Sequence, residues 1–184
     1  NLMKFRVFRF KRVKSTNDTA IRIIKKNYCD FGMILSELQT NGRGQYGRKW
    51  ISQKGNLFVS FFYNLNNFDI SLTKLTKINC MIIKKLFSKY YKKKINFKKP
   101  NDLIIKKKKI CGILQETFSN FYIKYLIVGI GINLIRSPNI KNNPSTNLYE
   151  LIKKKIKRKK IEDNLKNIFE KKLIKFYKKR IIIN

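Results

Sequence analysis

Residues 72–86 carry apolar side chains at intervals of three and four positions, and this spacing constrains the fold more than any other feature of the chain. Ser71 precedes the stripe and can cap a helix. A long helix with one apolar face is typically laid on a sheet, because that face has to be buried. The stripe consists of Leu72, Leu75, Ile78, Ile82, Ile83 and Leu86.

Short segments rich in β-branched and aromatic residues supply the sheet. A second helical pattern begins at Ser15, and a third spans residues 161–177. The acidic start of the third, Glu162-Asp163, suits the helix dipole. The run 153–160 is predicted to be a solvated helix end and linker. We therefore predict an α/β (α+β) fold, a mixed sheet flanked by helices, in a single domain over residues 1–184. Strands are predicted at residues 5–13, 33–38, 56–62, 95–97, 103–105, 110–116 and 122–132.

Composition excludes several classes of protein. No run of 18 uncharged apolar residues occurs, and the first five residues do not resemble a secretory signal, so a cytoplasmic location away from membranes is predicted. Cys29, Cys80 and Cys111 are far apart and odd in number, which argues against a disulfide framework and a zinc site and favours buried apolar roles. With no histidine, the chemistry must use lysine, arginine, carboxylates and backbone amides.

The net charge of +34 raises the alternative of a nucleic-acid-binding module. Only 9 of the 44 basic residues are arginine, and the lysines are scattered through predicted helix, strand and loop alike. A nucleic-acid binder usually concentrates arginine and aromatic residues on one surface. We therefore expect no specific binding to nucleic acid.

Two segments near the N-terminus could bind a polar ligand. Residues 15–17 (Ser-Thr-Asn) can act as a helix cap or as hydrogen-bonding groups for a neutral polar ring. Residues 39–50 (QTNGRGQYGRKW) combine three glycines with Arg43, Arg48 and Lys49, and can be a phosphate-binding loop or a flexible basic loop. The segment matches neither a Walker loop nor a Rossmann fingerprint. Trp50, the one tryptophan, offers a face for adenine.

Two later segments carry further signals. A short turn between residues 102–105 and 109–116 should bring Asp102 near Lys109, either as a site or as a structural ion pair. Gly129 and Gly131 alternate in a predicted strand, which indicates that a ligand or another backbone packs against that face.

Taken in order, these segments resemble the catalytic domain of biotin–protein ligases. The resemblance implies a fold shared with class II aminoacyl-tRNA synthetases and lipoate ligases. We expect the small SH3-like C-terminal barrel of that family to have no counterpart after Tyr177, and its winged helix to have none before Ser15. A lipoate–protein ligase, the enzymatic alternative, would be expected to carry a glycine triplet near a histidine. The matching stretches are STN (15–17), QTNGRGQYGRKW (39–50), GNLFVS (55–60), PNDL (100–103), KICGILQE (109–116) and VGIGINL (128–134).

The activity implied by the resemblance is formation of biotinyl-5′-adenylate from biotin and ATP with Mg²⁺. Transfer of biotin follows, to a lysine of a biotin carboxyl carrier protein, a subunit of acetyl-CoA carboxylase. The enzyme is expected to be a monomer or homodimer with no protein-held metal.

The resemblance also assigns roles to residues. Lys109, Arg43 and Asp102 are implied as catalytic. Two departures concern the site: Lys99 stands where the family usually has tryptophan, and Gln45 stands where arginine is frequent. Both are expected to weaken retention of the adenylate. The implied biotin-binding residues are Ser15, Thr16, Asn17, Gln39, Arg43, Gly44, Gln45, Lys109, Gly112, Leu114 and Gly131, and the implied ATP-binding residues are Arg43, Arg48, Lys49, Trp50, Asn101 and Asn133.

Overall fold

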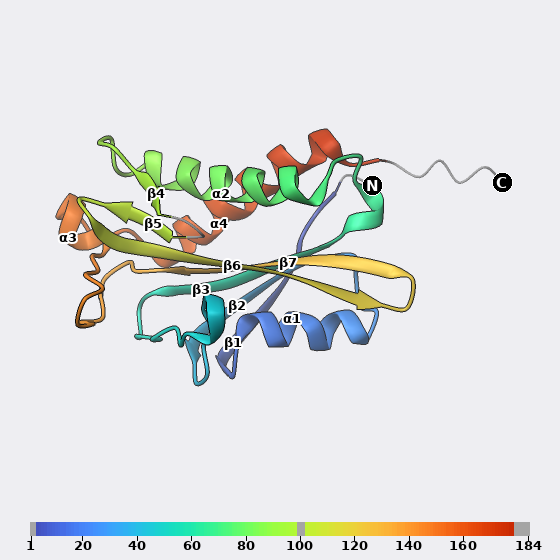
Figure 1. Ribbon diagram of the computed structural model, residues 1–184, viewed down its shortest axis with the longest axis horizontal. Coiled ribbons are helices and arrows are strands. Elements are labelled where there is room, and N and C mark those ends of the chain that lie inside the picture. The colour runs from blue at the N-terminus through green and yellow to red at the C-terminus, as the bar shows by residue number, and fades with distance from the viewer. Residues whose placement is uncertain (1–2, 99–101, 179–184) are drawn as a thin grey trace.

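The computed structural model describes residues 3–98 and 102–178. Within these residues seven strands form one mixed sheet in the order β1-β2-β3-β7-β6-β5-β4 (Figure 1). β1 runs parallel to β2, and every other neighbouring pair is antiparallel. The predicted mixed sheet is confirmed. The strands are β1 Arg6–Val13, β2 Phe31–Gln39, β3 Leu57–Asn64, β4 Asn96–Lys98, β5 Asp102–Ile105, β6 Lys108–Asn120 and β7 Ile123–Ile132.

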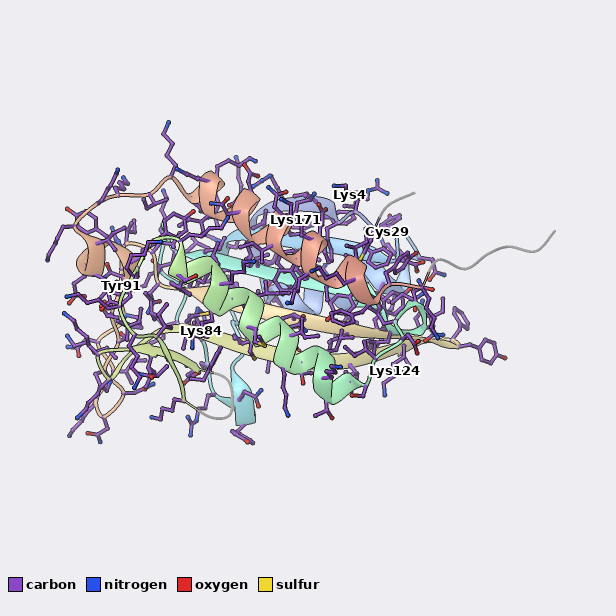
Figure 2. All side chains as sticks on the ribbon, turned by 90° about the horizontal axis from the view of Figure 1, so that it is seen from above. Lys4, Cys29, Lys84, Tyr91, Lys124 and Lys171 are labelled. Carbon is purple, nitrogen blue, oxygen red and sulfur yellow. The ribbon has the colours of Figure 1, made fainter. Side chains whose placement is uncertain are left out.

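Helices cover both faces of the sheet. α2 (Leu72–Ser88) and α4 (Arg158–Leu173) lie on one face, and α1 (Thr16–Lys25) lies on the other (Figure 1). Seen from above, α2 and α4 run side by side over the sheet, and nitrogen-tipped side chains surround the whole outline (Figure 2). The basic charge is therefore spread around the molecule, as the scattered lysines predict.

Local sequence explains where the helices begin. The side chain of Ser15 accepts a hydrogen bond from the Asp18 amide, and the side chain of Ser71 accepts one from the Lys74 amide. Each serine thereby satisfies an amide that the first helical turn leaves without a partner. Both predicted caps are confirmed.

The helices enclose two apolar clusters of unequal size. The larger lies between the sheet and α2 with α4, where the predicted stripe of α2 contributes Leu75, Ile78, Ile82, Ile83 and Leu86. Leu72, at the start of that stripe, is instead 38 % exposed. The smaller cluster, beneath α1, combines apolar residues of α1, β2, β3 and β7. Burial of these stripes is the main stabilising term of the fold.

The C-terminal part of the chain differs from the prediction. α4 begins at Arg158, so the last residues of the basic run are helical, and its first turn contains no acidic residue. Glu162 therefore does not act on the helix dipole. It is 3 % exposed and pairs with Arg9 of β1 and Arg158, both at 2.8 Å, which fastens α4 to the edge of the sheet.

Three smaller features complete the architecture. A short helix, α3 (Leu148–Ile152), was not predicted, because it is only five residues long. Cys111 is fully buried, as predicted, but Cys29 and Cys80 are only half-buried. Among residues 3–98 and 102–178, no helix is long and apolar enough to span a membrane.

Candidate active site

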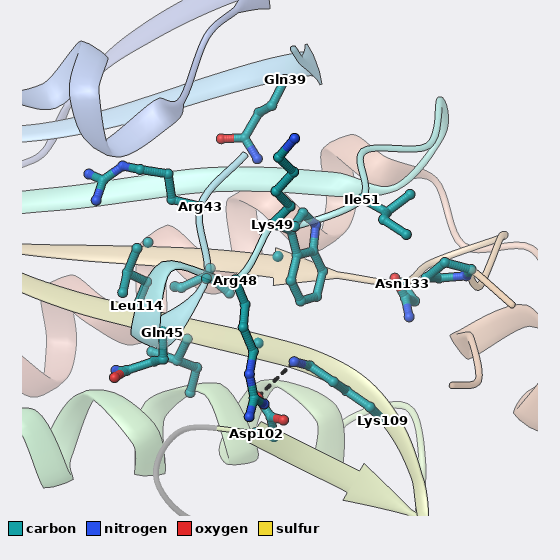
Figure 3. A pocket seen from close by; sticks show the side chains of 18 of the residues that line it. Gln39, Arg43, Gln45, Arg48, Lys49, Ile51, Asp102, Lys109, Leu114 and Asn133 are labelled. Atoms are coloured by element: carbon teal, nitrogen blue, oxygen red, sulfur yellow. Dashed lines mark ion pairs between the residues drawn. The ribbon is translucent and has the colours of Figure 1, made fainter. Parts of the chain in front are cut away.

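A cavity of about 300 Å³ lies over one face of the sheet (Figure 3). Its floor is formed by β6 and β7, and its walls come from the loop after β2, the start of α1 and the segment after β7. Residues far apart in the sequence therefore meet at one place. The segment after β7 contributes Pro138, Ile140, Asn143 and Ser145, none of which was predicted.

One end of the cavity is built from neutral hydrogen-bonding groups. Gln39 Oε1 accepts from the Thr16 amide at 2.8 Å and from Thr16 Oγ1 at 3.2 Å. Ser60 Oγ of β3 lies 2.7 Å from Thr16 Oγ1 and 2.6 Å from Asn17 Oδ1. Ser15, Thr16 and Asn17 are each at most 4 % exposed. Buried polar groups held this firmly can recognise a polar ring without reorganising.

Trp50 lies directly on the glycines of the floor. A Cβ atom on Gly112 would be 2.4 Å from Trp50 Cζ3, and one on Gly131 would be 2.4 Å from Trp50 Cε2. A Cβ on Gly129 would instead be 2.4 Å from Asn17 Oδ1. The glycines therefore make room for protein side chains, where the sequence predicted a ligand or another backbone. Trp50 Nε1 is buried without a partner among the described residues and can donate to a ligand.

The loop that carries Trp50 folds back on itself. The Trp50 amide donates to the Gly42 carbonyl at 2.8 Å, and the Gly44 amide donates to the Arg48 carbonyl at 2.7 Å. A Cβ on Gly42 would be 2.8 Å from the Trp50 carbonyl oxygen, so only glycine allows this closure. Residues 42–50, which we name the glycine loop, form a defined hairpin rather than an extended surface loop.

Arg43 leaves the glycine loop toward the neutral end of the cavity (Figure 3). Its guanidinium donates to Glu116 at 2.7 and 2.8 Å and to Asp18 at 2.8 Å. The hydrogen bonds that Arg43 donates to Glu116, with the charges of both carboxylates, raise the pKa of Arg43 against the opposing effect of burial. In this structure Arg43 therefore pairs with carboxylates, whereas the family resemblance assigned it to phosphate.

Lys109 and Asp102 mark the opposite end. Lys109 Nζ lies 2.8 Å from Asp102 Oδ1, and it sits 5.1 Å from the centre of the Trp50 ring. The β5–β6 hairpin brings the two together, with Lys106 and Lys107 in the left-handed turn conformation. The predicted proximity is confirmed. Burial raises the pKa of neighbouring Cys111, which keeps that thiol protonated.

The cations on this side outnumber the carboxylates. Arg48, Lys98 and Lys109 line the cavity here, whereas Lys49 extends toward Gln39 (Figure 3). Asp102 is the one acidic residue among the lining residues that the structure describes. The Arg48 side chain extends toward Asp102 (Figure 3). Such an excess of positive charge favours a polyanion such as a phosphate chain.

All but one of the predicted site residues line this single cavity. Asn101 falls outside the described residues. Asn133 lies at the cavity, but its side chain donates to the Thr146 carbonyl at 3.1 Å and supports the adjoining segment. The residues brought together are Ser15, Thr16, Asn17, Gln39, Arg43, Gly44, Gln45, Arg48, Lys49, Trp50, Asp102, Lys109, Gly112, Leu114, Gly131 and Asn133.

Three supporting residues lie within the sequence motifs, although the sequence alone predicted no role for them. Ser60 positions Thr16 and Asn17, and Glu116 binds Arg43 and Asn17. Asn56 Oδ1 accepts from three successive amides, those of residues 134, 135 and 136, at 3.0–3.2 Å. Asn56 and Ser60 are fully buried beside apolar strand residues. A polar residue within an otherwise apolar strand was the sequence signal that could have identified both, because a buried polar group needs a hydrogen-bond partner.

The described residues offer no protein-only metal site. No group of three histidine, cysteine, aspartate or glutamate side chains comes together in residues 3–98 and 102–178. Mg²⁺ commonly binds through one or two carboxylates together with substrate phosphates. Asp102 is the carboxylate in place for such a shared ion, although Lys109 already pairs with it.

The fold and cavity define a class of protein: a mixed-sheet domain that places neutral hydrogen-bonding groups and a cationic side around one small cavity. The profile of the Biotin/lipoate A/B protein ligase family matches residues 9–133. The chain belongs to this family.

Individual relatives agree with this assignment. The chain is 32 % identical over 132 residues to the bifunctional ligase/repressor BirA of Bacillus subtilis, covering 69 % of this chain and 40 % of that protein. It is 25 % identical over 131 residues to the biotin–[acetyl-CoA-carboxylase] ligase of Paracoccus denitrificans, covering 70 % and 54 %. The chain thus spans about half the length of these relatives or less.

A solved structure matches over more of the chain. Biotin protein ligase from Aquifex aeolicus, in complex with biotin and ATP, superposes with a TM-score of 0.78 at 30 % identity. The match covers 93 % of this chain and 71 % of that chain. The seven-stranded sheet with flanking helices is therefore the fold of this family.

Proposed function

We propose that this chain is an ATP-dependent biotin–protein ligase. It would join biotin to AMP and transfer the biotinyl group to a lysine of a biotin carboxyl carrier protein. The observation that carries the proposal is the division of one cavity into a neutral end at Thr16, Asn17 and Gln39 and a cationic side at Lys109 and Arg48. Biotin has the same division, a neutral ureido ring at one end and a carboxylate at the other.

Recognition of the ring would fall to the neutral end. Ser15 Oγ accepts from the Asp18 amide at 3.4 Å, so its hydroxyl proton can be donated into the cavity. The fixed network around Thr16 and Gln39 discriminates against apolar ligands, because binding one would leave buried polar groups unpaired. Leu114 and the Trp50 ring, which lies on Gly112 and Gly131, would form the apolar wall.

The first half-reaction suits a site without histidine. The carboxylate of biotin is ionised at neutral pH, so its oxygen can attack the α-phosphorus of ATP without a base. Pyrophosphate leaves, and a biotinyl-adenylate mixed anhydride results. The obstacle is repulsion between two anions, which Lys109, Arg48 and Lys49 would reduce.

Lys109 is the residue assigned to the reacting oxygens. Its ammonium is held by Asp102 at 2.8 Å and by the Trp50 face, so its direction is fixed before substrate arrives. A preorganised charge stabilises developing negative charge without reorganisation cost. Mg²⁺ bound with the nucleotide would neutralise further phosphate charge, and Asp102 is the carboxylate that could help to hold it.

The second half-reaction is an acyl transfer. The amine of the carrier lysine attacks the carbonyl carbon of the anhydride, an amide forms, and AMP leaves with the bonding electrons. Trp50 would face the adenine and, with the glycine loop, shield the anhydride from water. Gln45 lines the cavity where the family frequently has arginine, so this chain is expected to hold the adenylate with one cation fewer.

The test is a mass measurement on a purified carrier domain. The chain is incubated with ATP, Mg²⁺, the carrier and either biotin or lipoate, and the intact mass of the carrier is recorded. We expect a gain of one biotinyl group on the acceptor lysine with biotin. A gain with lipoate only, or no gain in either case, contradicts the proposal.

A further inference from the structure

Glu116 of β6 is not among the residues that line the cavity, yet it bonds to two residues that are. Its Oε2 atom accepts from Asn17 Nδ2 at 2.6 Å and from Arg43 Nη2 at 2.8 Å, and its Oε1 atom accepts from Arg43 Nη1 at 2.7 Å. Asn17 stands at the neutral end, and Arg43 belongs to the glycine loop. One carboxylate therefore joins the two parts of the site.

The paired contact with Arg43 fixes the direction of that side chain. Two parallel N–H···O bonds between a guanidinium and a carboxylate are stronger and more directional than a single bond. The side chains are partly sheltered, at 34 % and 29 % exposure, so solvent screens the pair only in part. Asp18 adds a third bond at 2.8 Å. This cluster ties the glycine loop to the sheet.

The contact with Asn17 fixes the orientation of an amide. A carboxylate only accepts hydrogen bonds, so the NH₂ group of Asn17 must face Glu116, and its oxygen must face Ser60 Oγ at 2.6 Å. Leu114 O, 3.4 Å from Asn17 Nδ2, selects the same orientation. Asn17 is 2 % exposed, so an inverted amide would lack water to compensate for its lost bonds.

We propose that Glu116 is a positioning residue that sets the Asn17 amide for ring recognition and, through Arg43, holds the glycine loop against the sheet. The identity of the ring as biotin rests on the function proposed above. Glu116 acts through its two partners and does not touch the ligand. Arg43 is accordingly an anchor of the loop, and the phosphates are left to Arg48, Lys49 and Lys109.

The test compares Glu116→Gln with Glu37→Gln. Both variants remove one carboxylate from the same sheet, but Glu37 is exposed on β2 and is not among the residues that line the cavity. Hydrogen exchange of the unliganded proteins is followed by mass spectrometry on peptides that cover residues 42–50. Glu116→Gln should exchange about fivefold to tenfold faster there, because a charge-assisted pair is lost. In Glu116→Gln, peptides from the rest of β6 should exchange as in the wild type. In Glu37→Gln, the peptides that cover residues 42–50 should also exchange as in the wild type.

A second arm separates positioning from a general loss of structure. Steady-state adenylation should show the KM for biotin raised about tenfold in Glu116→Gln, with kcat at saturating biotin within about twofold of wild type. Arg43→Gln should accelerate exchange of the glycine loop as much as Glu116→Gln does. The double variant should exchange little faster than either single variant, because both single variants remove the same Arg43–Glu116 interaction.

The outcomes decide the two proposals separately. Unchanged exchange of the glycine loop in Glu116→Gln, or fully additive effects in the double variant, overturns the role of Glu116. A kcat that falls with an unchanged KM also overturns it. A wild-type chain inactive with biotin contradicts the proposed ligase function, and the exchange measurement, made without ligand, still decides whether Glu116 holds the loop.

Discussion

Replacing Gly131 by alanine should displace Trp50 from the floor of the cavity. The added Cβ would lie 2.4 Å from Trp50 Cε2, 2.5 Å from Cζ2 and 2.9 Å from Nε1. Non-bonded carbon atoms need about 3.5 Å, so the ring has to retreat by about 1 Å. Gly131 is paired with Phe58 of β3 and Gly112 of β6, which prevents its backbone from yielding.

The expected cost follows from this displacement. Overpacking of a close contact destabilises by about 1–3 kcal/mol. The retreating ring also loses its alignment with Lys109, now 5.1 Å from its centre, and a 1 Å displacement near reacting groups can lower the rate by about 10²-fold. Adenylation should fall accordingly while the protein remains folded.

Trp50 is the one tryptophan of the chain, so its fluorescence reports on its own position. Gly131→Ala should shift the emission maximum to longer wavelength and weaken the response to biotin. Gly129→Ala, two residues earlier on β7, is the matched control because its Cβ would strike Asn17 instead of Trp50. It should weaken biotin binding with the emission unchanged. An unshifted emission maximum in Gly131→Ala would show that the Trp50 ring does not pack on Gly131.

Four further predictions concern activity and stability. Lys109→Ala should lower biotin-dependent adenylation by about 10²- to 10³-fold with the fold retained in circular dichroism, and near-normal turnover would remove Lys109 from the mechanism. Asn56→Ala, which leaves three amides after β7 without their acceptor, should lower the free energy of unfolding in urea by about 3 kcal/mol, and a change below 1 kcal/mol would show that water replaces the side chain. Burial raises the pKa of Glu170, but hydrogen bonds from Lys166, the Phe5 amide and Lys4 outweigh burial and hold that pKa below its ordinary 4.5. The free energy of unfolding should therefore fall as pH drops from 4.5 toward the lowered pKa. Glu170→Gln should flatten that part of a stability–pH curve, and an unchanged slope would contradict the assignment. Because the net charge is +34, the melting temperature should rise with NaCl between about 0.05 and 0.5 M, and a fall would mean that screened ion pairs outweigh self-repulsion.

Much of the fold could be predicted because the sheet and α2 are encoded locally. The stripe ending at Leu86 and the cap at Ser71 are both visible in the sequence, and together they locate α2. The beginning of α4 could not be predicted, because Arg158 looks like part of a solvated basic run. It becomes helical once Glu162 is buried between Arg158 and Arg9 of β1, and that contact depends on tertiary structure.

The composition of the site was predictable and its internal connections were not. The motif order gathers Thr16, Lys109 and Trp50 at one cavity. The pairing of Arg43 with Glu116 could not be foreseen, because an arginine in a glycine-rich segment suggests phosphate binding equally well. Only the spatial approach of β6 to the loop distinguishes the two roles.

Exchange of labelled pyrophosphate into ATP shows whether the cavity activates biotin with ATP. The reaction needs no carrier protein and reports the reverse of adenylation. We predict exchange that depends on biotin, is lost in Lys109→Ala and is retained in Glu37→Gln. Exchange that proceeds equally without biotin, or that is absent from the folded wild-type chain at saturating biotin and ATP, would contradict activation of biotin at this cavity.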